Sequence, residues 1–304
     1  MKSRFAPDRG LTRRMLGTAF LLGLLYVAFA AALLVLLKSL LVAVVIAGGL
    51  LFVQYWFSDR IALYAMHGRV VTPEQAPELH GVVDRLCALA DMSKPAVAVA
   101  DADVPNAFAT GRSPNRAVLC VTTGLLRRLE PDELEGVLSH ELSHVAHRDV
   151  AVMTVASFLG VLAGLITRIG LYSGLYGGGM RRGRDNDNTA VVFMAVVGVS
   201  AVVYALSFLL TRALSRYREL SADRSGAILT GRPSALASAL TKVSGSMARI
   251  PTRDLRQAEP FNAFFFAPAL ASGFSLSSLF STHPPLQRRL DQLAALSRQL
   301  GQAV

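Results

Sequence analysis

Residues 131–144 read PDELEGVLSHELSH, the most informative segment of the chain. Pro131 is typical of the first turn of a helix, and the acidic residues after it suit the positive end of the helix dipole. On that helix His140 and His144 are four residues apart, so both imidazoles lie on one face and can bind one metal ion. Glu141 then points toward a metal-bound water and can take its proton. The segment therefore predicts a zinc-hydrolase helix of the HExxH type.

The HExxH pattern is specific because the chain has only six histidines. The alternative is an amphipathic helix with two surface histidines. A third histidine, His147, follows the pair, but on a straight helix it lies about 10 Å from His140 along the axis. One ion cannot bind both of them together with His144, so we expect His147 to be a surface or supporting residue.

The third ligand is expected to be a carboxylate on a later helix. Glu219 and Asp223 are four residues apart on one helical face. Glu219 can bind the metal, and Asp223 can accept a hydrogen bond from a ligand imidazole and fix its tautomer. In the alternative, both carboxylates pair with neighbouring arginines on a solvated face (Arg216, Arg218 and Arg224). The HExxH pattern upstream favours the metal site.

The chain is too apolar for an ordinary soluble protein. Hydrophobic residues make up 52% of the 304 residues and charged residues 17%, against about 25% charged in an average soluble domain. Four uncharged runs carry this excess, at 15–37, 39–57, 150–167 and 188–211. A helix needs about 20 apolar residues to cross a bilayer. The first, second and fourth runs therefore predict membrane spans, and the third is borderline because its length also suits a buried core helix.

The net charge of +10 indicates basic flanks of membrane spans at the cytoplasmic face. Nucleic-acid binding is not expected, because no basic run is interleaved with aromatic residues. The first run is too long for a signal-peptide core and a second run follows it, so an uncleaved pair of helices is expected. Cys87 and Cys120 fit a reducing compartment. The basic arm at the N-terminus contains one acid among five basic residues (Lys2, Arg4, Asp8, Arg9, Arg13 and Arg14).

The apolar runs divide the chain into four segments. Residues 1–57 are expected to form the basic arm and two transmembrane helices, and residues 58–149 the first half of a zinc peptidase domain with the HExxH helix. Residues 150–212 are expected to form a membrane hairpin, whose connection is rich in glycine and charge. Residues 213–304 are expected to form the second half of the peptidase domain. The two halves are together long enough to bury one core.

Short strands and amphipathic helices are predicted within the two halves. In the first half the pattern predicts a helix over 72–91, a strand over 96–100, and a hairpin of 106–110 with 117–121. In the second half it predicts a helix that continues from the fourth run through residue 223 and breaks at 231–233, a helix over 234–247, and a final amphipathic helix from Leu286 to Leu296. The aromatic stretch 261–280 is expected to be a membrane-surface loop or core.

Six segments together resemble the HtpX family of membrane zinc metallopeptidases, to which the CAAX prenyl proteases and periplasmic chaperone-proteases are related. They occur in the family's order and span most of the chain: NAFA at 106–109, VTTGLL at 121–126, DEL at 132–134, VLSHELSH at 137–144, RELSAD at 218–223 and FSTHPP at 280–285. The apolar hairpin between the HExxH helix and the glutamate helix also matches. The aromatic run at 264–266 is heavier than the family pattern leads us to expect.

The resemblance implies a zincin-like α+β fold with about four transmembrane helices and one zinc ion per chain. It supports Glu219 as the third ligand. It also implies that Asn106, Ala107 and Phe108 belong to an edge strand that pairs with substrate main chain. His283 would lie close to the zinc, where it steadies the oxyanion or occupies the open site in a resting form. An equal alternative for His283 is a structural turn residue.

The expected function is a membrane-bound zinc endopeptidase that cuts misfolded or damaged membrane proteins, with Glu141 as general base. The expected partners are polypeptide substrates and a lipid bilayer, without nucleic acid, and the oligomeric state is left open. The expected location is the inner (cell) membrane, with the catalytic domain facing the cytoplasm. Three arginines between the third and fourth runs oppose a hairpin that spans fully outward (Arg181, Arg182 and Arg184).

Three other functions fit part of this pattern. An intramembrane site-2-type protease also uses HExxH, but here acidic residues lead into the motif and the fourth run holds no acid. A CAAX-type processing protease would differ in the shape of its substrate pocket. A non-catalytic membrane chaperone or scaffold would be expected to lose a ligand or Glu141, and this chain keeps them all.

Overall fold

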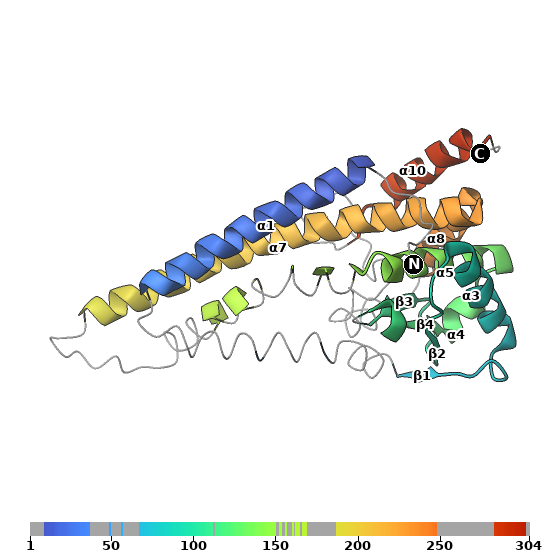
Figure 1. The fold of residues 1–304 in the computed structure, drawn as a ribbon, viewed down its shortest axis with the longest axis horizontal. Coiled ribbons are helices and arrows are strands. Elements are labelled where there is room, and N and C mark those ends of the chain that lie inside the picture. Colours follow the sequence, from blue (N-terminus) through green and yellow to red (C-terminus); the bar gives the residue numbers. More distant parts are fainter. Residues whose placement is uncertain are drawn as a thin grey trace.

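The computed structural model describes two long helices and a body of short strands and helices (Figure 1). The predicted stretches 261–280 and 264–266 lie outside the described residues, as do most of the second apolar run and nearly all of the loop before the fourth run. The described residues are 9–36, 67–111, 113–149, 187–247 and 283–301, with Gly49, Trp56 and separate positions between 152 and 168.

Four short strands form one mixed sheet: β1 (Gly68–Val70), β2 (Ala96–Ala100), β3 (Ala107–Thr110) and β4 (Val118–Thr122). The strand order is β1-β2-β4-β3. β2 and β4 are parallel, whereas β3 pairs with β4 in an antiparallel ladder, which confirms the predicted hairpin. β3 therefore lies at an edge of the sheet, beside the helix that carries HExxH (Figure 1).

Alternating side chains of the sheet enter two separate clusters, as the period of a strand requires. Leu119 and Val121 of β4 join the main core, whereas Val118 and Cys120 pack on the opposite face. Most other members of the main core come from helices: α3 (Pro77–Ala90), α4 (Thr123–Leu126), α5 (Pro131–Ala146), α8 (Pro233–Met247) and α10 (Leu286–Gln299). The observed fold is mixed α+β, as predicted.

The helix predicted from residue 72 begins five residues later, at Pro77. Proline in a helix interior clashes with the preceding turn, and the residue before proline is forced toward extended backbone. Ala76 accordingly has φ −143° and ψ 64°. The preceding residues form a turn in which the Thr72 N–H donates to the Gln75 side chain over 2.9 Å.

The two long helices are α1 (Arg9–Leu36) and α7 (Asp187–Thr230), and they lie side by side (Figure 1). Leu22 packs with Leu214 and Phe29 with Val203, so the helices run antiparallel. Both contain segments long and apolar enough to cross a membrane, Thr12–Ala32 and Val191–Thr230. Large apolar side chains remain exposed along both, as a lipid-facing surface requires (Leu16, Phe20, Leu24 and Val27 on α1; Val191, Met194, Val202 and Leu209 on α7).

The 44 residues of α7 extend about 66 Å at 1.5 Å per residue. That length is about twice the roughly 30 Å hydrocarbon core of a bilayer. The helix therefore continues beyond a membrane span into the α+β body, as the sequence predicts, and it ends before Gly231. Its C-terminal part carries Glu219 and Asp223.

Candidate metal centre

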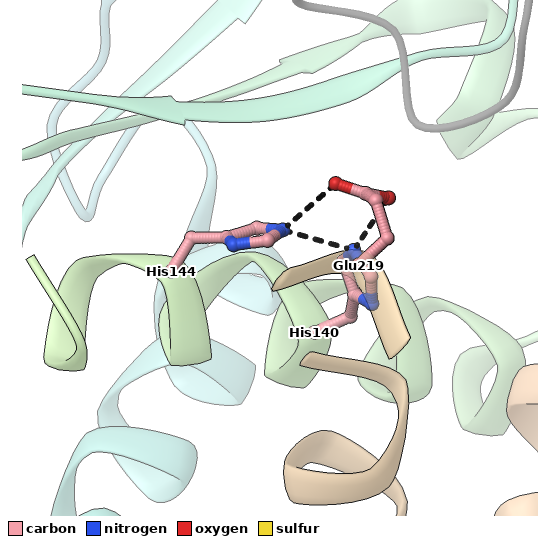
Figure 2. A group of neighbouring side chains, drawn as sticks. All are labelled: His140, His144 and Glu219. Atoms are coloured by element: carbon pink, nitrogen blue, oxygen red, sulfur yellow. Dashed lines mark hydrogen bonds and ion pairs between the residues drawn. The ribbon is translucent and has the colours of Figure 1, made fainter. Parts of the chain in front are cut away.

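Three buried side chains, His140 and His144 of α5 and Glu219 of α7, point toward one another (Figure 2). Their potential ligand atoms all lie within 4.8 Å of one another. The Nε2 atoms of the two histidines are 3.2 Å apart. Glu219 Oε1 is 3.4 Å from His144 Nε2 and Glu219 Oε2 is 3.7 Å from His140 Nε2. The structure thus brings together the three residues that the sequence predicts as ligands.

A close crossing of α5 and α7 places Glu219 beside the histidines. A Cβ atom on Gly226 would lie 2.9 Å from the His140 backbone nitrogen, so only glycine permits this approach without a shift. The Ser139 hydroxyl donates to the Gly226 carbonyl over 3.1 Å. Glu219, Asp223 and Gly226 follow the 3.6-residue period of a helix, so the face that touches α5 also carries both carboxylates.

His140 is held by Asp223, as the sequence predicts. Its Nδ1 lies 2.9 Å from Asp223 Oδ1. Arg289 of α10 donates to the same carboxylate from two nitrogens, over 2.7 and 2.6 Å. Arg289 is only 2% exposed. Sequence reasoning missed Arg289, although its position among the leucines of the apolar face of α10 was a usable signal.

His144 is held by Asp149, which sequence reasoning also missed. Its Nδ1 lies 2.6 Å from Asp149 Oδ2, and Arg218 forms an ion pair with the same oxygen at 2.8 Å. Burial would raise the pKa of Asp149, but the charge of Arg218 and the bond with His144 hold it well below its usual range. Arg218 therefore pairs with Asp149, not with the carboxylates considered in the sequence alternative.

The donor set fits a divalent metal ion. Each histidine contacts an aspartate through its Nδ1, and the two Nε2 atoms point toward one another and toward Glu219. Hydrogen bonds of this kind from Nδ1 fix the orientation of ligand imidazoles in metal sites. Burial lowers the pKa of His144, but its bonds to Asp149 and Glu219 outweigh burial and raise the pKa to about 10. The site therefore stabilises positive charge, and imidazole and carboxylate ligands suit zinc.

Glu141 lies on the same helix and contacts the edge strand. Its Oε2 accepts a hydrogen bond of 3.0 Å from the Ala109 N–H of β3. Burial raises the pKa of Glu141 to about 8. A carboxyl group with that pKa can accept and release a proton near neutral pH, and the bond from Ala109 fixes one of its two oxygens.

The predicted substrate segment lies at and just before β3. Asn106 is buried, and its carbonyl accepts from the Thr122 N–H over 2.9 Å. Successive residues of an antiparallel strand direct their backbone N–H and C=O groups to opposite sides. The backbone groups of Phe108 therefore also point toward β4, whereas those of Ala107 and Ala109 point toward the open edge. A small pocket near the end of β3 is lined by Thr110, Gly111, His144 and Asp149.

The other two histidines of the sequence analysis, His283 and His147, lie in different parts of the structure. His283 is buried, and its Nδ1 lies 3.0 Å from Glu219 Oε2, so it lies at the centre. His147 caps the C-terminus of α5, and its Nδ1 is 2.8 Å from the Ser143 carbonyl oxygen. The group of three ligand candidates does not include His147.

Residues 73–297 match the model of peptidase family M48. The chain belongs to this family. It is 67% identical to Protease HtpX homolog 1 of Streptomyces coelicolor over 303 residues, which cover 100% of this chain and 98% of that protein. It is 53% identical to the Protease HtpX homolog of Moorella thermoacetica, and this alignment covers 99% of each. The resemblance to HtpX proteases drawn from the sequence is confirmed.

The fold is shared with a structure that has been solved. The crystal structure of S. mikatae Ste24p superposes on this chain with a TM-score of 0.54 at 20% identity, covering 89% of this chain. The chain spans 62% of the length of that structure. The family, the HtpX relatives and the two apolar helices together identify a membrane metalloprotease with an M48 zincin-like fold.

Proposed function

We propose that this protein is a zinc-dependent endopeptidase of the cell membrane that hydrolyses peptide bonds of misfolded or damaged membrane proteins. The observation that carries the proposal is the convergence of His140, His144 and Glu219 beside Glu141 and the edge of β3. The family supports a protease acting on polypeptides. The membrane helices support substrates that lie in or near the bilayer.

In this proposal His140, His144 and Glu219 would hold one zinc ion. When bound, zinc supplies a Lewis acid that makes water nucleophilic at neutral pH. Asp223 and Asp149 keep a proton on each Nδ1, which leaves each Nε2 lone pair for the metal. His283, in contact with Glu219, would steady that ligand and the negative charge that develops on the substrate oxygen.

Glu141 would act as the general base. Its carboxylate takes a proton from the attacking water while the water oxygen bonds to the peptide carbonyl carbon. The same proton then passes to the leaving nitrogen as the C–N bond breaks. The Ala109 N–H supports this role because it holds the carboxylate in one orientation.

The substrate would bind as an extra strand along β3. At the open edge, Ala107 offers its N–H and C=O and Ala109 offers its C=O, while the Ala109 N–H donates to Glu141. An extended peptide can pair with these free groups by β-augmentation. Asn106 and Phe108 would fix the position of β3 through their pairing with β4. Main-chain recognition of this kind suits a protease with many substrates, because it does not depend on side-chain identity.

The catalytic body would face the cytoplasm. The N-terminal end of α1 lies at the catalytic end of α7, because Met15 packs into the cluster of Leu22 and Leu214. Arg13 and Arg14 lie at that end of α1, and Arg212 directly follows the fourth uncharged run on α7. Arginines beside a span favour the cytoplasmic side.

The test is cleavage of casein, an unfolded protein, by the purified full chain in detergent with zinc. Glu141→Gln keeps both histidines and removes the base. We expect cleavage by the wild type and a loss of at least about 100-fold in the variant, the scale of general-base catalysis. Equal cleavage by both would contradict the role of Glu141. Absence of cleavage by a zinc-loaded wild type would contradict the broad endopeptidase and favour a scaffold or a narrow processing protease.

A further inference from the structure

Asp149 and Arg218 meet His144 where the chain joins its membrane segments. Both side chains are nearly inaccessible, with 5% and 9% exposed. Asp149 directly precedes the third apolar run, and Arg218 belongs to α7, one residue before Glu219. We propose that Asp149 and Arg218 form a positioning pair that orients His144 toward the metal and attaches this ligand to the helix that crosses the membrane.

The backbone after α5 is arranged to deliver Asp149. Helix α5 ends at Ala146, and Arg148 adopts a φ of 56°, the left-handed region that side-chain-bearing residues rarely occupy. This conformation turns the chain back, so that the Asp149 carboxylate reaches His144 Nδ1 at 2.6 Å. A conformation of this kind persists only where surrounding contacts hold it.

Arg218 acts through Asp149. A buried carboxylate without a partner is unfavourable, and a guanidinium at 2.8 Å compensates its charge. Held in this way, Asp149 accepts a hydrogen bond from the Nδ1–H of His144, which leaves the Nε2 lone pair for the metal. The arrangement repeats that of His140, Asp223 and Arg289, but its arginine comes from α7 and not from α10.

The pair makes the metal site depend on the placement of α7. Glu219 and Arg218 are neighbours on that helix, so a shift of α7 against α5 moves a proposed ligand and the support of a second ligand together. The proposal rests on the metal-binding role proposed above for His144. It adds that zinc affinity is set partly by a contact made at the membrane side of the site.

The experiment measures zinc affinity of the full chain in detergent, by competition with a chromophoric chelator and without substrate. Asp149→Asn, Arg218→Gln and the double variant are compared with Glu135→Gln. Glu135 is a matched control, because it is also a buried carboxylate, belongs to α5, and pairs with an arginine, Arg85, at 2.8 Å. We expect each single variant to bind zinc about 10–100-fold more weakly, and the double variant to lose no more than Asp149→Asn alone.

Arg218→Lys and cobalt(II) substitution separate positioning from general stability. The lysine variant keeps the charge and should recover most of the affinity. The visible spectrum of cobalt-loaded Arg218→Gln should differ from wild type, because the ligand geometry changes, whereas that of Glu135→Gln should not. If Asp149→Asn does not fold, the two Arg218 variants carry the test.

Zinc affinity of Asp149→Asn or Arg218→Gln within about twofold of wild type would overturn the proposal, as would additive losses in the double variant. These outcomes are distinct from failure of the proposed function. A wild type that binds zinc and cleaves no protein would contradict the peptidase, while the affinities would still decide the role of the pair.

Discussion

Glu133 joins the start of α5 to α8. It accepts hydrogen bonds from the Glu130 N–H at 2.9 Å, the Ser238 hydroxyl at 2.6 Å and Lys242 at 2.8 Å. Burial alone would raise the pKa of Glu133, but the bonds from Lys242 and Ser238 outweigh it and lower the pKa below 4.5. Its ionised form therefore stabilises the helix that carries the site.

Replacing Glu133 by Gln should lower the free energy of unfolding by about 1 kcal/mol at pH 7, because a buried hydrogen-bonded charge is lost. A group whose native pKa is lowered contributes stability above its unfolded pKa and loses it as the pH falls through the native value. The gap in melting temperature between wild type and variant should thus shrink below pH 4.5. A gap that stays constant or grows on acidification would contradict this account.

The proposed ligands were predictable because a helix fixes the spacing of its own side chains. His140 and His144 are four residues apart, so they share a face of α5 wherever that helix lies in the fold. The same holds for Glu219 and Asp223 on α7. Asp149 and Arg289 were not predictable in the same way. The contact of Asp149 depends on the left-handed turn at Arg148, which has no spacing pattern. The helical spacing of α10 marks Arg289 as a residue of the apolar face, but its partner depends on how α10 packs against α7.

At the scale of elements, the crossing of α5 and α7 sets the geometry of the centre. The two helices touch at Gly226, where the backbones approach too closely for a side chain. Seven residues earlier on the same face, Glu219 reaches the histidines. The distance between these two helices therefore controls whether the three potential ligands can share one ion.

Gly226→Ala should destabilise the protein and weaken zinc binding. Alanine normally stabilises a helix interior by about 0.5–1 kcal/mol relative to glycine, but overpacking against His140 costs about 1–3 kcal/mol and separates the helices. Gly198→Ala is the control, because the same helix has open space there. The melting temperature and the zinc content should fall for Gly226→Ala and not for Gly198→Ala. Equal behaviour of the two would show that the crossing tolerates a side chain.

The elements themselves were largely predictable from period and turn residues. The hairpin of β3 and β4 and the starts of α5 and α8 agree with the sequence analysis. The predicted start of α3 was wrong. Pro73 and Pro77 both suit the first turn of a helix, and only the conformation of Ala76 selects Pro77. The edge position of β3 depends on the strand order, which no local pattern specifies.

At the scale of the whole molecule, α7 links the membrane to the metal centre without interruption. The antiparallel packing of α1 returns the basic N-terminal end to the side of the catalytic body. Among the residues that the structure describes, the candidate spanning helices are those of the first and fourth apolar runs. Spans from the second and third runs, and the four-part division of the chain, stay predictions.

A cysteine-labelling experiment tests the proposed orientation. Burial raises the pKa of the native thiols, Cys87 to about 11 and Cys120 to about 12, so both should label poorly. Arg9→Cys at the start of α1 and Arg69→Cys in the catalytic body place thiols on exposed positions. Both should react with a membrane-impermeant maleimide only after the cells are permeabilised. Labelling of either one in intact cells would contradict a cytoplasmic catalytic body.

The most direct measurement is the zinc content and zinc X-ray absorption spectrum of the purified full chain and of Glu219→Ala. We predict one zinc ion per wild-type chain, with nitrogen and oxygen neighbours at about 2.0–2.2 Å, and at least about tenfold weaker zinc retention in the variant. Full zinc content in Glu219→Ala, or a wild-type spectrum that lacks imidazole ligands, would contradict a metal centre built from α5 and α7.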